Sequence, residues 1–112
     1  MGGMKRAVET VTRYEMKQPN YKFNEGALIK EFKTYIDETY KSHYGQGKIQ
    51  TSEVIIDRGN GLGFFLGNID KYNSRYGNKG NSSDHRKDLM KVLHYALLAL
   101  YEHDRLKDSK ES

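Results

Sequence analysis

The stretch DLMKVLHYALLAL, residues 88–100, decides the fold of this chain. Its apolar side chains recur at spacings of three and four residues, which is the repeat of one face of an α-helix. The clearest stripe consists of Leu89, Val92, Leu93, Ala96 and Leu100. We therefore predict a helix that buries this stripe in the core of the protein.

Polar residues mark the two ends of this helix. Ser82, Ser83 or Asp84 is expected to cap its start, because short oxygen-bearing side chains satisfy the free amides there. The helix is expected to end at about Asp104, after which the chain should fray. Residues 108–112 are predicted to be a disordered tail.

A second helical pattern lies just before the first. In FFLGNIDKYNSRYG, residues 64–77, one face carries Phe65, Ile69, Tyr72 and Tyr76 at spacings of four, three and four. Because only the short segment 77–83 separates the two patterns, we predict an antiparallel helical hairpin at the C-terminal side of the chain.

Two further helices are predicted upstream of the hairpin. One runs from an N-cap at Asn24 to about Lys41, and the other begins at Thr51 or Ser52 and ends at the glycines of GNGLG, residues 59–63. The apolar side of the first is formed by Leu28, Phe32, Tyr35, Ile36 and Thr39.

These patterns together predict the fold class and the organisation of the chain. No segment alternates with the period of a β-strand, so the fold class is all-α: a small helical bundle with the C-terminal hairpin. Residues 1–23 are predicted to be a flexible N-terminal arm, and residues 24–107 one helical domain.

Composition narrows the classes of function. The chain has no cysteine, and its four histidines form no metal-binding spacing, so we expect no metal site. No apolar run approaches the roughly 20 residues of a membrane span, so we expect a soluble protein without a membrane partner. The lack of cysteine suits a cytoplasmic location. With 112 residues the core should be thin, which favours a homo-oligomer.

The candidate site lies along a polar edge beside the core face of residues 64–77. Asn68, Lys71 and Arg75 share that edge, and the hairpin could bring them opposite Asp88 and Lys91. Arginine and lysine bind phosphate oxygens, so this arrangement indicates an anion site. Lys79 lies near the turn, and Tyr95 follows Asp88 and Lys91 along one helical line. The alternative is structural. Asp88 would form ordinary surface ion pairs with Lys71 or Lys91, or share one buried ion-pair network with Arg75.

Other candidates have weaker patterns. GNGLGFFLG, residues 59–67, has the glycines of a phosphate loop but neither a preceding strand nor a following GKS or GKT, so Gly59, Gly61 and Gly63 are expected to form turns and Gly67 to allow close helix packing. His43 is a candidate general base, or else a helix cap. No carboxylate pair of the kind that holds magnesium is present, so Mg²⁺ is expected only if the protein transfers a phosphoryl group. A net charge of +4 without a basic stripe makes specific nucleic-acid binding unexpected.

Three segments carry a resemblance to a known family: HYGQGKIQTSEVI, GFFLGNIDKYNSRYGNKG and HRKDLMKVLHYALLAL. They resemble a small phage-encoded domain family of unknown function, which also occurs in a phage nucleotide kinase that lacks a Walker loop. The resemblance covers about residues 43–102. Gly80 to Ser83 and Val92 depart from the family pattern, and the additional kinase regions are missing at this length. The positions that the resemblance carries over are His43, Tyr44, Gln50, Gly67, Asn68, Lys71, Tyr72, Arg75, Gly77, Lys79, Asp88, Leu89, Lys91 and Tyr95.

The residues and the resemblance lead to one principal hypothesis of function. The chain is expected to bind a nucleotide or related phosphate compound through its basic helical site, in the cytoplasm of the host cell if it is phage-encoded, and to serve nucleotide metabolism. Whether it is an enzyme stays open. The alternatives are an interaction protein that binds a host or phage protein through the same basic and aromatic face, and a weak nucleic-acid binder.

Overall fold

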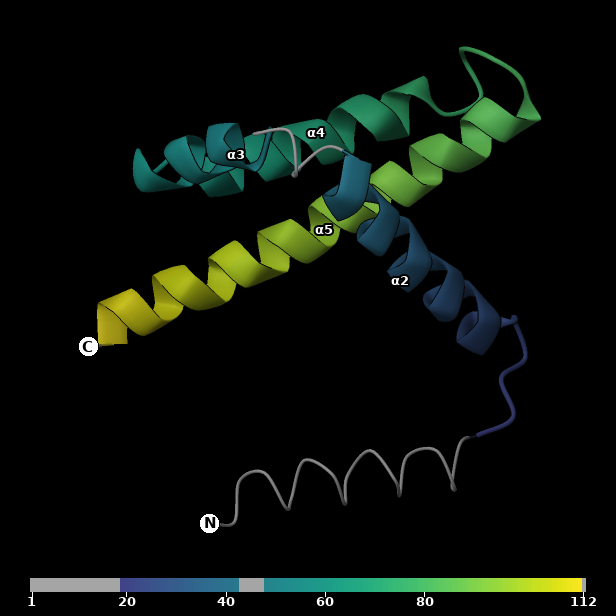
Figure 1. Ribbon diagram of the computed structural model, residues 1–112, viewed down its shortest axis with the longest axis horizontal. Helices are drawn as coiled ribbons and strands as arrows, with labels where there is room; N and C mark the ends of the chain where they lie inside the picture. Colours follow the sequence, from purple (N-terminus) through teal and green to yellow (C-terminus); the bar gives the residue numbers. More distant parts are fainter. Residues whose placement is uncertain (1–18, 43–47, 112) are drawn as a thin grey trace. The chain divides into compact units, whose positions relative to one another are not determined.

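The computed structural model describes residues 19–42 and 48–111, and these residues are almost entirely helical (Figure 1). No strand occurs in these two ranges, so the predicted all-α class is confirmed. The described helices are α2 (Glu25–Ser42), α3 (Lys48–Asp57), α4 (Gly61–Arg75) and α5 (Ser82–Glu111).

The chain forms two compact units, residues 1–30 and 31–112, which divide within α2. In the first unit, α2 begins directly after Asn24, as expected. The carbonyl oxygen of Asn24 accepts a hydrogen bond of 3.1 Å from the Leu28 amide. The φ of Asn24 is 61°, outside the extended range that side-chain caps use, and asparagine tolerates this left-handed conformation well.

The second unit contains the predicted antiparallel hairpin, formed by α4 and α5 (Figure 1). Contacts at both ends define its direction. Arg75 near the end of α4 pairs with Asp88 near the start of α5, and Gly61 at the start of α4 lies against Glu102 far along α5.

The residue that caps α5 is Asn81, so the prediction of Ser82, Ser83 or Asp84 was wrong by one position. The Asn81 side-chain oxygen accepts from the Asp84 amide, and the Asp84 carboxylate accepts from the Asn81 amide, both at 3.1 Å. This reciprocal arrangement is a capping box, with Asp84 in the third helical position. Gly80 has a φ of +81°, and any side chain there would collide with Asp84.

Three helix boundaries differ from the predictions. Helix α5 continues past Asp104 to Glu111, into the segment 108–112 that was expected to be disordered, because RLKDSKE contains neither glycine nor proline. Helix α4 starts at Gly61 rather than near Phe64, and α3 starts at Lys48 rather than at Thr51 or Ser52. Glycine lowers helix propensity, but two glycines in a first turn do not prevent a helix.

The core lies between α4 and α5 and is thin. Phe65 is only 1% exposed, and Ala99 is also buried. On the predicted core face of α4, Ile69 and Tyr72 are half-buried, whereas Tyr76 is exposed.

The predicted core stripe of α5 is largely on the surface. Leu89, Leu93 and Leu100 are exposed, Ala96 is exposed and Val92 is half-buried. The residues of α5 that are buried are instead Asp88, His94, Ala99 and Glu102. The prediction was wrong because helical periodicity identifies an apolar face but not the element that covers it.

Within the second unit, α2 from Glu31 onward packs on α5 through aromatic rings. The ring of His94 makes edge contacts with Phe32 and Tyr35, at centroid distances of 6.3 and 5.9 Å. Phe32, Tyr35, Ile36 and Thr39 are half-buried, as their spacing predicts.

Candidate functional site

Two lysines converge on the ring of Tyr72, one from each helix of the hairpin. The Lys71 Nζ atom of α4 lies 5.0 Å from the Tyr72 ring centroid, and the Lys91 Nζ atom of α5 lies 5.3 Å from it. Both distances are within the range of cation–π attraction. Tyr72 in turn stacks on Tyr95 of α5, with centroids 5.9 Å apart and ring planes 12° apart. We call Lys71, Tyr72, Lys91 and Tyr95 the Tyr72 cluster.

The charges of the two lysines are not neutralised by the protein. Within residues 19–42 and 48–111, no carboxylate forms an ion pair with Lys71 or Lys91. The positive charge of Lys91 also reaches His94. Burial lowers the pKa of that histidine most, and the Lys91 charge lowers it further. His94 is therefore neutral at pH 7, and it adds no positive charge to the site.

Asp88 pairs with Arg75, as the structural alternative predicted for these two residues, and it forms no ion pair with Lys71 or Lys91 among the described residues. The Arg75 Nε atom lies 3.4 Å from the Asp88 Oδ1 atom. The Asp88 side chain is 5% exposed and the Arg75 side chain 44% exposed, so one end of this ion pair is buried and the other reaches water. Arg75 thus has a structural task, because it compensates a buried carboxylate.

Two buried polar atoms next to this ion pair have no partner among the described residues. They are the Oδ2 atom of Asp88 and the Nε2 atom of His85, one turn earlier on α5. The His85 ring makes an edge contact with Tyr76, at a centroid distance of 5.7 Å. Buried polar atoms are nearly always hydrogen-bonded, so a donor from water or from a ligand is expected at Asp88.

The remaining predicted site residues are not drawn into the Tyr72 cluster. The Asn68 amide donates a hydrogen bond of 2.9 Å to the Phe64 carbonyl oxygen of its own helix. Lys79 is exposed in the loop between α4 and α5. Gln50 lies in α3, but its side chain is outside the description, and His43 lies outside the described residues altogether.

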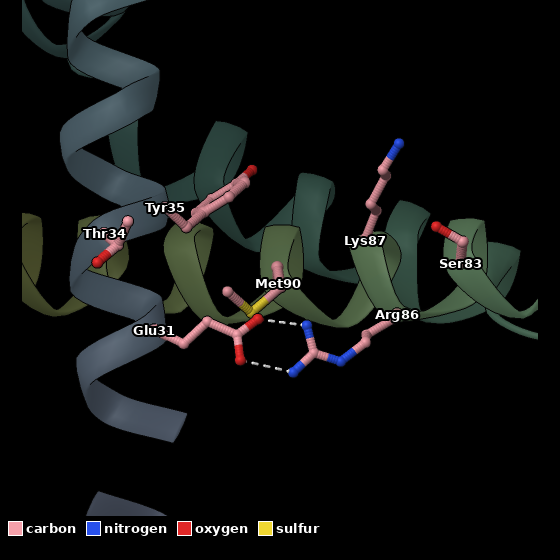
Figure 2. A pocket seen from close by; sticks show the side chains of 7 residues that line it. All are labelled: Glu31, Thr34, Tyr35, Ser83, Arg86, Lys87 and Met90. Carbon is pink, nitrogen blue, oxygen red and sulfur yellow. Dashed lines mark hydrogen bonds and ion pairs between the residues drawn. The ribbon is translucent and has the colours of Figure 1, made fainter. Parts of the chain in front are cut away.

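A separate groove lies between α2 and α5 and has a volume of about 320 Å³ (Figure 2). At its edge, both carboxylate oxygens of Glu31 accept hydrogen bonds from the Arg86 guanidinium, and the Nη2–Oε1 distance is 2.8 Å. These bonds lower the pKa of Glu31. The groove is lined by Glu31, Thr34, Tyr35, Ser83, Arg86, Lys87 and Met90. Since Glu31 neutralises Arg86, this groove is a weaker anion site than the Tyr72 cluster.

The glycine-rich segment before α4 does not hold a phosphate. A Cβ atom on Gly61 would collide with the Glu102 carboxylate, so this carboxylate occupies the space beside the start of α4. Glu102 is 1% exposed and accepts a hydrogen bond from Arg105. An anion near a helix N-terminus is favourable, and here a side chain of the protein supplies it. Gly59 has a φ of +80° and forms the expected turn. Gly61 and Gly63 were also expected to form turns, but they lie in the first turn of α4. Gly67 faces open space, so its predicted role in close packing was wrong.

The described part of the chain contains neither a cluster of metal ligands nor a membrane-spanning helix. Residues 19–42 and 48–111 bring no three histidine or acidic side chains together as metal ligands. None of the helices in these ranges has the length and apolarity needed to cross a membrane.

Comparison with known proteins gives one match, to the model of a family described as protein of unknown function, DUF3310. The match covers residues 38–97, more than half of the chain. The chain belongs to the DUF3310 family. No curated protein and no solved structure matches it. The DUF3310 region contains the whole Tyr72 cluster and the Arg75–Asp88 ion pair, but it ends before Ala99 and Glu102.

Three residues of this DUF3310 chain that take part in the contacts described above were not predicted from the sequence. Glu31 lies 55 residues from Arg86, and Glu102 follows the last residue of the predicted core stripe, Leu100. No local pattern reveals either contact. His85 could have been noted, because it lies one turn before Asp88 on the same helix.

Proposed function

We propose that this chain binds a phosphate-bearing small molecule of the nucleotide class at the Tyr72 cluster. The observation that carries the proposal is the approach of two ammonium groups, from different helices, to one aromatic ring without a carboxylate partner. The resemblance of the sequence to a phage family with a nucleotide kinase directs the choice of ligand to nucleotides. A cytoplasmic protein of phage origin with a role in nucleotide metabolism is part of the same proposal.

Electrostatics favours a multiply charged anion at this place. Two like charges that share one ring repel each other, and a phosphate between them replaces that repulsion by two attractions. Lysine provides a compact charge that suits phosphate oxygens. The unpartnered Oδ2 atom of Asp88 can accept a hydrogen bond from a ligand amino group, which inorganic phosphate lacks. A nucleotide carries both chemical groups.

Catalysis is not part of the proposal. Phosphoryl transfer is supported by positioned magnesium ions, and Asp88, an acidic residue one turn before Lys91, is already paired with Arg75. Magnesium enters only if the chain proves to transfer phosphoryl groups. Binding is therefore the activity to measure first.

The test is a thermal-shift screen with inorganic phosphate and with nucleoside mono-, di- and triphosphates and cyclic nucleotides. A ligand that binds only the folded state raises the melting temperature. The best ligand is then titrated against wild type, Lys71→Gln and Lys91→Gln. The loss of one charge-assisted contact, about 1.5–3 kcal/mol, should weaken binding roughly tenfold or more.

The matched control is Lys107→Gln, which removes an exposed lysine of α5 far from the Tyr72 cluster and should leave the affinity unchanged. If no phosphate compound shifts the melting temperature, the proposal is wrong. It is also wrong if the double variant Lys71→Gln, Lys91→Gln binds as tightly as wild type.

A second candidate function is a protein-binding module. The exposed leucines on the outer side of α5 favour it, since solvated apolar side chains that gather on one face often mark protein contacts. Weak nucleic-acid binding would depend strongly on salt, because a net charge of +4 acts only through the release of counterions.

A further inference from the structure

Lys87 is a third lysine of the hairpin that has no acidic partner. It lies four residues before Lys91 on α5, so the two side chains leave the same face of the helix, about 6 Å apart along its axis. In the part of the chain that the structure describes, Lys87 forms no ion pair. Its ammonium group points away from the ion pair of Glu31 and Arg86 at the edge of the neighbouring groove (Figure 2).

The acidic residues that lie close to Lys87 in the sequence are engaged elsewhere. The carboxylate of Asp84, one turn earlier, accepts a hydrogen bond from a backbone amide in the cap of α5. Asp88, the next residue, is buried and paired with Arg75. Like charges four residues apart in a helix repel each other, so Lys87 and Lys91 lower the stability of α5 by their repulsion. An anion between the two ammonium groups would remove this cost.

Tyr35 of α2 connects the surroundings of Lys87 with the Tyr72 cluster. Its side chain lines the groove together with that of Lys87. Burial raises the pKa of Tyr35 most, the side chain of Thr39 opposes this effect, and Tyr72 raises the pKa further. Tyr35 is therefore within electrostatic reach of Tyr72. The helical spacing from Lys91 and the position of Tyr35 both place Lys87 next to the Tyr72 cluster.

We propose that the anion site extends from the Tyr72 cluster to Lys87, and that it selects nucleotides with two or more phosphate groups. This choice of ligand class rests on the proposed function of the Tyr72 cluster. Lys71 and Lys91 hold one phosphate group, and Lys87 holds the next one along the phosphate chain. Lysine suits this arrangement because its N–H donors rotate freely toward phosphate oxygens. A nucleoside monophosphate or a cyclic nucleotide leaves Lys87 without a partner and binds more weakly.

The experiment is a calorimetric titration at one fixed salt concentration, since salt screens contacts between exposed charges. The probes are the mono-, di- and triphosphates of adenosine, guanosine, cytidine and thymidine. For a base that binds, wild type should bind the diphosphate and the triphosphate about tenfold or more tightly than the monophosphate. This factor is the gain expected from one additional charge-assisted contact.

The variant Lys87→Gln should bind the diphosphate about tenfold less tightly than wild type and the monophosphate equally well. Lys87→Arg keeps the charge and should restore most of the diphosphate affinity. The control Lys107→Gln makes the same change of net charge at another exposed lysine of α5 and should leave both affinities unchanged. Because Lys87 is exposed, these variants should fold, and melting without ligand verifies this.

The outcomes separate a failure of this extension from a failure of the proposed function. If no nucleotide binds, or if the double variant Lys71→Gln, Lys91→Gln binds like wild type, both are wrong. If the monophosphate binds through Lys71 and Lys91 as tightly as the diphosphate, only the extension to Lys87 is wrong.

Three further results would overturn the extension alone. One is a diphosphate affinity that Lys87→Gln leaves unchanged. Another is an equal loss of monophosphate and diphosphate affinity in Lys87→Gln, which would mean that this lysine does not distinguish the second phosphate group. The third is a loss of diphosphate affinity in Lys107→Gln as large as that in Lys87→Gln, which would mean that only the net charge of the chain matters.

Discussion

The two sides of α5 contrast sharply. The side that faces α4 buries the carboxylates of Asp88 and Glu102, whereas Leu89, Leu93 and Leu97 on the outer side are 44%, 50% and 45% exposed. In a typical amphipathic helix the arrangement is the reverse. Each buried carboxylate has an arginine beside it, Arg75 for Asp88 and Arg105 for Glu102. The inner side is therefore specified by ion pairs and aromatic rings rather than by the leucines of α5.

This contrast shows which groups hold the hairpin together. Between α4 and α5 the large apolar contribution comes from Phe65, whose ring lies 5.7 Å from that of Phe64 and 6.4 Å from that of Tyr95. Aromatic side chains bury large areas while tolerating polar neighbours. A thin core of this kind depends heavily on each ring.

The largest expected effect is therefore at Phe65. Phe65→Ala should lower the free energy of unfolding by about 3–5 kcal/mol, because it removes a ring that is 1% exposed and leaves a cavity. The control Phe64→Ala changes the neighbouring ring, which is 37% exposed, and should cost about 1 kcal/mol through its edge contact with Tyr95. Urea denaturation at one protein concentration measures both. Equal losses would mean that the inner side of α5 is not the core.

An intermediate effect is expected at the ion pair of the inner side. Arg75→Ala leaves a carboxylate that is 5% exposed without a partner and should cost about 1–3 kcal/mol. In the double variant Arg75→Ala, Asp88→Ala the loss of unfolding free energy should be smaller than the sum of the two single losses, because the two side chains share one interaction. The control Lys71→Ala removes an exposed cation of the same helix and should cost about 0.5 kcal/mol or less. If the losses of unfolding free energy in Arg75→Ala and Asp88→Ala simply add in the double variant, the two side chains do not stabilise each other. Arg75 would then serve ligand binding alone.

The smallest effect is a dependence of stability on pH that comes from His94. Burial, followed by the charge of Lys91, lowers its pKa in the folded state below the ordinary value of 6.5. Below about pH 6.5 the unfolded chain binds a proton that the folded chain does not, so the free energy of unfolding should fall as the pH decreases, until the pH drops below the folded pKa.

The measurement is urea denaturation between about pH 7.5 and 5 for wild type and His94→Gln. The variant should lose this part of the slope, whereas His103→Gln, at an exposed position of the same helix, should retain it. Lys91→Gln should make the slope shallower, since one cause of the shift is removed. If the unfolding free energy of His94→Gln depends on pH as that of wild type does, His94 is not the cause of the dependence. Its side of α5 would then admit water.

Much of the fold follows from local sequence patterns. The apolar spacing in α4 identified Phe65 and Tyr72, and the short connection to α5 identified the hairpin. The spacing of Asn81 and Asp84 also contains the capping box that was overlooked. The buried side of α5 could not be predicted in the same way, because the most apolar face of that helix is not the face that α4 covers.

In the candidate site, too, local spacing predicted some contacts and not others. The helical spacings correctly brought Lys71 and Arg75 of α4 together with Asp88 and Lys91 of α5. They could not decide which cation pairs with Asp88, because that depends on side-chain geometry within a few ångströms. The pairing of Glu31 with Arg86 depends on how α2 packs on α5, which no pattern within either helix records.

The contact between Gly61 and Glu102 has a consequence for where this domain ends. The family match stops at residue 97, whereas the carboxylate that fills the space beside Gly61, and the arginine that holds this carboxylate, come later in the chain. A DUF3310 unit transplanted or shortened according to the family boundary would start α4 against an empty space and lose Ala99 from its core. The smallest autonomous unit of this chain therefore extends at least through Arg105.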